Sequence, residues 1–399
     1  MWSHYQNSQD IDDLISNFKS VLSTQPLHVI KAMWGENALL RDCFSGNEVD
    51  FDNLTPPERV IYLENLISNF KSALASHCED VIKSMWDGNP LLRDWYSGKL
   101  VNFGDEAQPD WRAISEEELI DNFKSALSSL CKDVIKAIWN GNQLLRNRYS
   151  GEQGDFGNQI QTDLRAFLED LISNFKSVLA SRCKDIIKAM WDGNLLLRNW
   201  YSGKLVNFGN QTQRDWHAIS LEDLISNFKS ALASRNIDVI KATWDGNPRL
   251  QDWYSGKQMN FGNLAQPDWR TISEEELIND FKSALSSQTC YVIKAMWDES
   301  ALLRDCFSGK QVDFGNLAPP ERVIYLENLI SNFKAALASH CEDVFKAMWD
   351  GNPLLQNWYS GKQVNFGDEA QPDWRAISEE ELISNFKSVL ATQKHYVSK

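Results

Sequence analysis

The sequence has no uninterrupted apolar run near the roughly 18 to 20 residues that a membrane-spanning helix needs. Its start, MWSHYQNSQD, has neither the basic region nor the apolar region of a secretory signal peptide. These absences predict a cytoplasmic protein that does not bind a membrane. Apolar residues still make up 43% of the chain, which excludes general disorder.

The sequence also lacks the short motifs that carry enzyme chemistry. It contains no G-x-x-x-x-G-K-[ST], G-x-G-x-x-G, H-E-x-x-H or G-x-S-x-G motif, and its six histidines form no cluster in the sequence. Adjacent carboxylates such as Glu116 and Glu117 are abundant, but they suit the positive first turn of a helix. We therefore predict that the chain is not an enzyme and binds no cofactor.

Cysteine is scarce, with seven residues in 399. The chain has no C-x-x-C pair and no Cys/His spacing typical of zinc sites, so no metal is expected. Four cysteines share one position of the repeat described below: Cys78, Cys131, Cys183 and Cys341. Stacked repeats would hold them about 10 Å apart, beyond the reach of a disulfide. We expect them to be small buried side chains in a reducing compartment.

Positively charged residues are fewer than negatively charged ones, with 40 Lys and Arg residues and 55 Asp and Glu residues. The net charge of −15 favours solubility. It disfavours general nucleic-acid binding, because a phosphate backbone would be repelled.

What the sequence does contain is a repeat of 52 or 53 residues. A phenylalanine marks each copy, at Phe18, Phe70, Phe123, Phe175, Phe228, Phe281, Phe333 and Phe386. A tryptophan follows sixteen residues later, at Trp34, Trp86, Trp139, Trp191, Trp244, Trp297 and Trp349. A fixed period of this length is typical of a solenoid, so we predict seven repeats and the opening helix of an eighth. Residues 43–127 also match residues 306–390 closely, which indicates that a block of repeats was copied.

Each repeat is predicted to hold three helices. In the third copy, helix A carries Leu119, Phe123 and Leu127 on one face. Helix B is expected at about 131–139, after a break or at least a sharp kink, because Pro26 of the first copy would disrupt a continuous helix. Helix B should end at a left-handed glycine, as at Gly88. Asn89 followed by proline then opens a short helix C.

The segment between repeats, such as residues 99–114, has no helical period and reads as a long loop. Val101, Phe103 and Trp111 could fix it to the helices. The sequences TPPE at 55–58 and APPE at 318–321 change this pattern, and there helix A is predicted to start about two turns early.

A single repeat has too few apolar residues to offset the entropy of ordering it, so neighbours must cover each other. We therefore predict an all-α tandem helical-repeat solenoid over 10–392, with polar tails at 1–9 and 393–399. The organisation is similar to HEAT and tetratricopeptide arrays, although the period and motifs match neither.

Two sets of residues are candidates for partner binding. The first is a ladder of lysines three residues before each marker tryptophan: Lys31, Lys83, Lys136, Lys188, Lys241, Lys294 and Lys346. It reads either as a solvated helix face or as a basic stripe for an acidic, repetitive partner. The second set lies in the linkers, where partial exposure is expected: Trp111, Trp216, Trp269 and Trp374. The marker tryptophans in helix B are expected in the core, with a row of stacking platforms for a ligand as the alternative.

The near identity of the copies favours a periodic partner, avidity or self-association over a single docking site. We predict a non-enzymatic scaffold that binds proteins along an extended surface. A self-assembling filament protein or homo-oligomer is the main alternative. A nucleic-acid binder acting through the lysine stripe, and a host-interacting protein of a virus or parasite, are the others.

Overall fold

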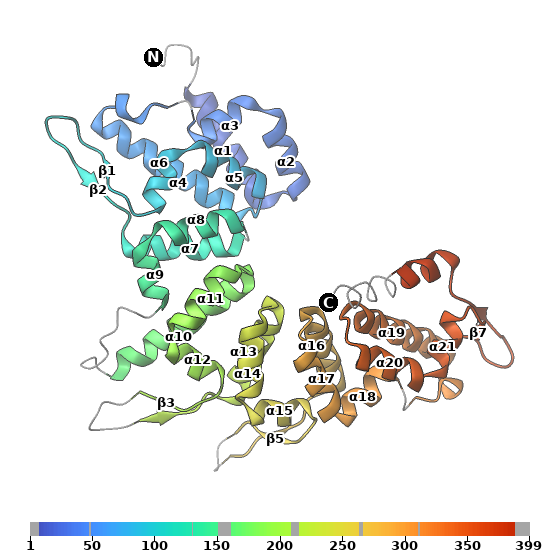
Figure 1. The fold of residues 1–399 in the computed structure, drawn as a ribbon. Helices are drawn as coiled ribbons and strands as arrows, with labels where there is room; N and C mark the ends of the chain where they lie inside the picture. Colours follow the sequence, from blue (N-terminus) through green and yellow to red (C-terminus); the bar gives the residue numbers. More distant parts are fainter. Residues whose placement is uncertain are drawn as a thin grey trace, which may run out of the picture. The chain divides into compact units, whose positions relative to one another are not determined.

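The computed structural model describes residues 8–47, 49–129, 131–150, 161–208, 215–262, 266–309 and 312–387. The chain divides into two compact units, residues 1–197 and 198–399, and each is described by itself (Figure 1). The described part is mostly helical and its strands are only two residues long, so the all-α prediction is confirmed. The first helix begins at Ser8, two residues before the predicted start of the helical array at residue 10. The C-terminal tail at 393–399 lies outside the described residues.

The helices follow the predicted order A, B, C. The first unit holds α1 (Ser8–Thr24), α2 (Leu27–Glu36), α3 (Ala38–Ser45), α4 (Pro56–Ala75), α5 (Glu79–Gly88), α6 (Pro90–Tyr96), α7 (Glu116–Ser129), α8 (Lys132–Gly141), α9 (Gln143–Ser150), α10 (Gln161–Ser181) and α11 (Lys184–Gly193). Helix α12 (Leu195–Tyr201) contains the boundary between the units. The second unit holds α13 (Leu221–Ser234), α14 (Ile237–Asp245), α15 (Pro248–Tyr254), α16 (Glu274–Ser287), α17 (Cys290–Glu299), α18 (Ala301–Ser308), α19 (Pro319–Ala338), α20 (Glu342–Gly351) and α21 (Pro353–Tyr359). Residues 379–387 form a further helix.

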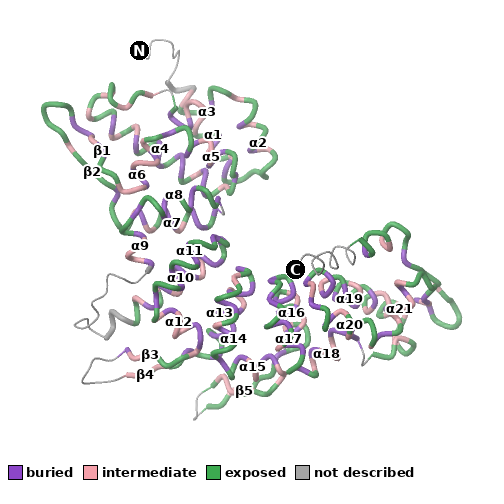
Figure 2. The backbone as a smooth tube through the Cα atoms, in the orientation of Figure 1, coloured by how far each residue is buried: buried purple, intermediate pink, exposed green. Residues whose placement is uncertain are grey.

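Equivalent helices of successive repeats pack side by side within each unit. In the first unit, α4 lies against α1 and α7, and α5 lies against α2 and α8. In the second unit, α16 lies against α13 and α19, and α17 lies against α14 and α20. Figure 2 shows the buried residues on the sides of the helices that face one another.

The marker aromatics form the core of each repeat. Phe70 packs against Trp86 with ring centroids 5.8 Å apart, and both rings contact Tyr96 from helix C. The same three-ring cluster recurs around Phe123 and around Phe281. The prediction that the helix B tryptophans are core residues is confirmed for the first six. Trp349 is instead 37% exposed, because no later helix B packs against α20 in the described part of the chain.

The predicted break between helices A and B is confirmed, and a left-handed residue marks it. His77, Arg182, Arg235, Gln288 and His340 have φ between 55° and 59°. The next residue then caps helix B, which places Cys131 before α8 and shifts the helix from the predicted 131–139 to 132–141.

The predicted left-handed glycine at the end of helix B is wrong. Gly88 is helical and Asn89 is extended, with its side chain accepting from the Leu92 backbone N–H at 3.0 Å. Glycine is required for another reason. A Cβ on Gly141 would lie 2.8 Å from the Cβ of Ser97, at the end of the preceding helix C. The left-handed glycines are those after helix C, such as Gly98, with φ of 76°.

The predicted long loop is a short antiparallel hairpin wherever helix C carries a tryptophan. The pairs are β1 (Val101–Asn102) with β2 (Trp111–Arg112), β3 (Val206–Asn207) with β4 (Trp216–His217), β5 (Met259–Asn260) with β6 (Trp269–Arg270), and β7 (Val364–Asn365) with β8 (Trp374–Arg375). The Trp95 ring contacts Phe103 at 6.0 Å, so helix C anchors the hairpin that follows it. In Figure 1 the described hairpins lie outside the packed helices of their unit.

Where Cys43 or Cys306 replaces that tryptophan, the linker is different. A 3₁₀ turn, η1 (Phe51–Asn53) or η3 (Phe314–Asn316), leads into α4 or α19. These helices have 20 residues against 14 in α7, which confirms the predicted early start. The Tyr62 hydroxyl of α4 donates to the Gly46 carbonyl at 2.7 Å and so connects the long helix to the end of the preceding helix C. Arg148 replaces the same tryptophan before α10, which has 21 residues and whose early start was not predicted.

Candidate interaction surfaces

The ladder of helix B lysines lies at the junctions between successive repeats. Four of these lysines pair with an aspartate in the first turn of the next helix B. The nitrogen to oxygen distances are 3.0 Å for Lys31 and Asp80, 2.8 Å for Lys83 and Asp133, 2.6 Å for Lys136 and Asp185, and 2.9 Å for Lys294 and Asp343. The paired carboxylates raise the pKa of these lysines. The ladder therefore connects neighbours along the chain.

Three lysines of the ladder differ. Lys188 pairs with Asp192 of its own helix at 2.7 Å. Lys241 lies 5.0 Å from the centroid of Tyr291, because a tyrosine takes the place of the aspartate in that copy. Lys346 lines an apolar groove at the end of the second unit, together with Phe345 and Trp349.

A second set of lysines, one residue after each marker phenylalanine, connects the A helices. Lys71 lies 3.6 Å from Glu118, Lys229 lies 2.7 Å from Glu276, and Lys334 lies 2.9 Å from Glu381. Exposed pairs of this kind contribute only about 0–1 kcal/mol each to stability. These pairs have a clearer effect on the surface charge, because carboxylates of the same chain neutralise much of the positive charge of the lysines.

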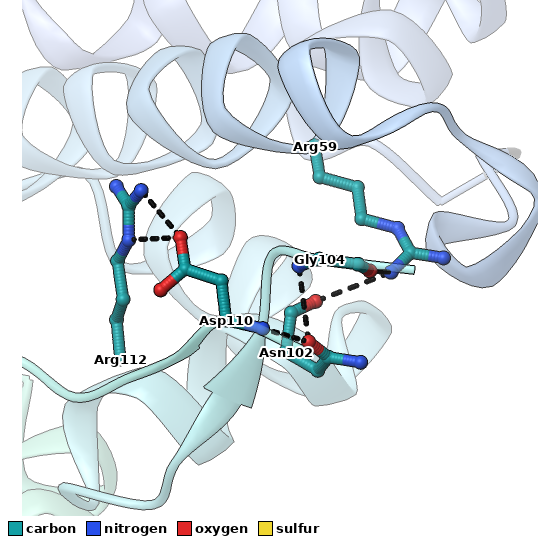
Figure 3. Close-up of polar contacts among 5 residues, drawn as sticks. All are labelled: Arg59, Asn102, Gly104, Asp110 and Arg112. Atoms are coloured by element: carbon teal, nitrogen blue, oxygen red, sulfur yellow. Dashed lines mark hydrogen bonds and ion pairs between the residues drawn. The ribbon is translucent and has the colours of Figure 1, made fainter. Parts of the chain in front are cut away.

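The hairpins are the second candidate surface, and in the first of them one asparagine holds the two ends of the connecting loop. Asn102 Oδ1 accepts hydrogen bonds from the backbone N–H groups of Gly104 and Asp110, at 3.0 and 2.9 Å (Figure 3). The Phe103 N–H donates to the Asp110 carbonyl at 2.8 Å. Asn260 and Asn365 make the equivalent bonds in their own hairpins. A hairpin with two paired residues in each strand is only marginally stable by itself, and these hydrogen bonds stabilise it.

An arginine next to the tryptophan braces the hairpin from one side. The Arg112 guanidinium donates to Asp110 Oδ2 at 2.6 and 2.9 Å and lies 5.1 Å from the Phe103 ring centroid. These hydrogen bonds from Arg112 lower the pKa of Asp110. Arg270 and Arg375 repeat the arrangement over Phe261 and Phe366.

A buried arginine from the preceding helix A supports the first hairpin through backbone carbonyls. Arg59 of α4 donates to the Gly104 carbonyl and, at 3.4 Å, to the Asn102 carbonyl (Figure 3). It also donates to the Phe51 and Asp52 carbonyls of η1, at 3.2 and 2.7 Å. Arg322 of α19 ties Gly315 to Gly367 in the same way. Neither arginine was predicted as a functional residue from the sequence. The signal was the sequence PPERVIY, which occurs twice and places an arginine beside apolar residues at the start of a helix.

Each of the four hairpins presents an indole to solvent. The exposed fractions are 59% for Trp111, 53% for Trp216, 58% for Trp269 and 57% for Trp374. Leu100 is 62% exposed and shares an outward face with Trp111, because Val101 between Leu100 and Asn102 is buried and Asn102 pairs with Trp111. None of the four indoles makes a hydrogen bond or a ring contact within the described residues.

The structure thus places the two predicted sets on different elements, the lysines on helix B and the tryptophans on the linker hairpins. No described helix is long and apolar enough to cross a membrane. Comparison with protein-family models, with curated proteins and with solved structures gives no significant match for this chain.

Proposed function

We propose that this chain is a non-enzymatic helical-repeat scaffold, with its repeats stacked as a solenoid, that binds another protein through its hairpin tryptophans. The side-by-side packing of A helices and of B helices within each unit supports the stacked arrangement. The absence of catalytic motifs from the sequence supports a binding role.

The observation that carries the proposal is the exposure of an indole at one equivalent position in four hairpins. Tryptophan is among the residues that contribute most to protein interfaces, because it buries a large area at little cost in side-chain entropy. Asn102, Arg112 and Arg59 hold the first of these indoles on an ordered strand. Equivalent contacts at several sites allow a repetitive partner to bind by avidity.

The lysine ladder supports a partner less well than the indoles do. Four of its seven members already pair with aspartates of the next repeat, so an acidic partner would have to displace those contacts. The negative net charge also opposes an acidic partner at long range. For the same reason nucleic-acid binding is not favoured.

The test compares three variants of the full chain as baits for the same protein mixture. The first changes Trp111, Trp216, Trp269 and Trp374 to alanine. The matched control changes four exposed apolar residues on helices, Ile61, Leu144, Leu195 and Ile324, to alanine. The third changes the helix B lysine ladder to glutamine. Proteins held by the wild type and the control, but lost from the tryptophan variant, would support the proposal. Equal recovery by the tryptophan variant and the wild type would refute it, and selective loss from the glutamine variant would transfer the role to the lysines.

One observation favours self-association as a second candidate. The groove on α20 is lined by Phe345, Trp349 and Phe386, and Phe386 is 61% exposed. In earlier repeats the equivalent residues, such as Ile82, Trp86 and Phe123, are buried. Light scattering over a concentration series should show oligomers that Trp349→Glu removes. A wild-type chain that stays monomeric at all concentrations would exclude this candidate.

A further inference from the structure

Two of the seven cysteines, Cys290 and Cys341, meet at a junction between repeats of the second unit. Cys290 is the first residue of α17 and is exposed, whereas Cys341 caps α20 and is only 6% exposed. The two side chains are close enough to affect each other electrostatically, and both thiols are free. This contact crosses from the sixth repeat to the seventh.

A shift of one residue explains the contact. Cys341 shares its position with Cys78, Cys131 and Cys183, eight residues after the marker phenylalanine, whereas Cys290 lies nine residues after Phe281. The first residue of one helix B lies near the cap of the next. Glu79 is close enough to Cys131, and Lys132 to Cys183, to affect the thiol electrostatically. In the sequence, only the junction between repeats six and seven has a cysteine both at the first residue of one helix B and at the cap of the next.

The surrounding contacts fix both thiols. Helices α17 and α20 pack together, and Lys294 pairs with Asp343 at 2.9 Å about one turn from the sulfur atoms. The Ser339 hydroxyl accepts from the Cys341 backbone N–H at 3.2 Å, which holds the cap in place. The thiols therefore meet on ordered helix ends.

We propose that Cys290 and Cys341 are a modification site, at which oxidation forms a reversible disulfide that ties the sixth repeat to the seventh. The oxidant is a low-molecular-weight disulfide, R–S–S–R. The Cys290 thiolate attacks one of its sulfur atoms, forming a mixed disulfide and releasing RS⁻. The Cys341 thiolate then attacks the Cys290 sulfur and releases the second RS⁻. The two protein thiols lose two protons and two electrons, and the oxidant is reduced to two thiols.

The unequal exposure of the two residues sets this order. Cys290 is open to the oxidant, whereas Cys341 is covered by protein. Burial, with the neighbouring Cys290 thiol as a smaller cause, also raises the pKa of Cys341, so it is the poorer first nucleophile. Because the second step needs the Cys341 thiolate, ring closure should become faster as the pH rises.

The test uses the full chain incubated with oxidised glutathione at mildly alkaline pH. Thiols titrated after denaturation should fall from seven to five, the mass should fall by about two hydrogens, and a peptide containing both Cys290 and Cys341 should appear after digestion without reductant. Reduction should restore seven thiols. The matched control Cys131→Ser should fall from six to four, because it keeps the pair.

Cys290→Ser and Cys341→Ser should each remove the linked peptide, and Cys341→Ser should stop at a glutathione adduct on Cys290. Three outcomes would overturn the proposal. They are a wild-type chain that keeps seven thiols, a wild-type chain that ends as the Cys290 adduct, and a disulfide that joins two chains. Circular dichroism of each serine variant establishes that it is folded.

Discussion

Asp280 is the one acid at a position where the later repeats otherwise carry a buried asparagine, such as Asn122 or Asn227. Tyr254 donates to its Oδ2 at 2.9 Å, and Lys229 Nζ lies 3.2 Å away. Burial raises the pKa of Asp280 despite the nearby lysine. The folded state therefore binds this proton more tightly than the unfolded state does.

The contribution of Asp280 to stability is complete below its ordinary pKa and is lost as the pH rises through the raised value. We predict that Asp280→Asn melts at a higher temperature than the wild type at neutral pH, and that the difference shrinks as the pH falls toward 4. Thermal melts across this range measure it. A difference that does not change with pH would show that the Asp280 carboxyl does not titrate as argued.

Arg59 gives a second prediction at the residue scale. Arg59→Met would leave the carbonyls of Phe51, Asp52 and Gly104 without this donor, at a cost of about 2–4 kcal/mol. Urea unfolding measures the loss, and hydrogen exchange at the Phe103 amide should become faster. Lys99→Met, at an exposed ion pair, should change stability by less than about 1 kcal/mol. Slow exchange at Phe103 in the Arg59 variant would show that the hairpin does not depend on this arginine.

At the element scale, the glycine near the end of helix B allows helix propensity to be distinguished from a steric clash between repeats. Gly35 has nothing within 4 Å of an added Cβ, so Gly35→Ala should stabilise the protein by about 0.5–1 kcal/mol through helix propensity. Gly141→Ala would place its Cβ against Ser97 and should instead lower stability. Urea unfolding of both variants checks the opposite signs. Stabilisation by Gly141→Ala would mean that the contact between these repeats relaxes freely.

The helices could be predicted from the sequence because their signals are local. The apolar period of helix A, the proline at position 26 and the Asn-Pro pair at 89–90 each act within a few residues. The hairpins could not be predicted in this way. Residues 99–114 have no strand period, and the fold of the linker depends on Trp95 before it and on Arg59 from an earlier helix. The exposure of the linker tryptophans was predicted, but the rigid support beneath them was not.

At the scale of the whole molecule, the helix B lysines act between repeats. Changing Lys31, Lys83, Lys136 and Lys294 together to glutamine removes four cross-repeat ion pairs and should lower the stability measurably at low salt. The loss should shrink in 1 M salt, where surface charges are screened. Urea unfolding at both salt concentrations measures it. A loss that is the same at both would point to packing of the lysine stems.

The two kinds of linker also bear on how such a chain can lengthen. The two matching segments contain Cys43 and Cys306, the residues that stand in the place of the indole before a long helix. Each segment therefore carries with it the matching tyrosine, Tyr62 or Tyr325, whose hydroxyl bonds the carbonyl of the nearby glycine. A genetic crossover upstream of the cysteine transfers both the cysteine and the tyrosine that depends on it. One placed between the cysteine and the tyrosine would pair a bulky indole with an early helix, and the recombinant protein should fold poorly.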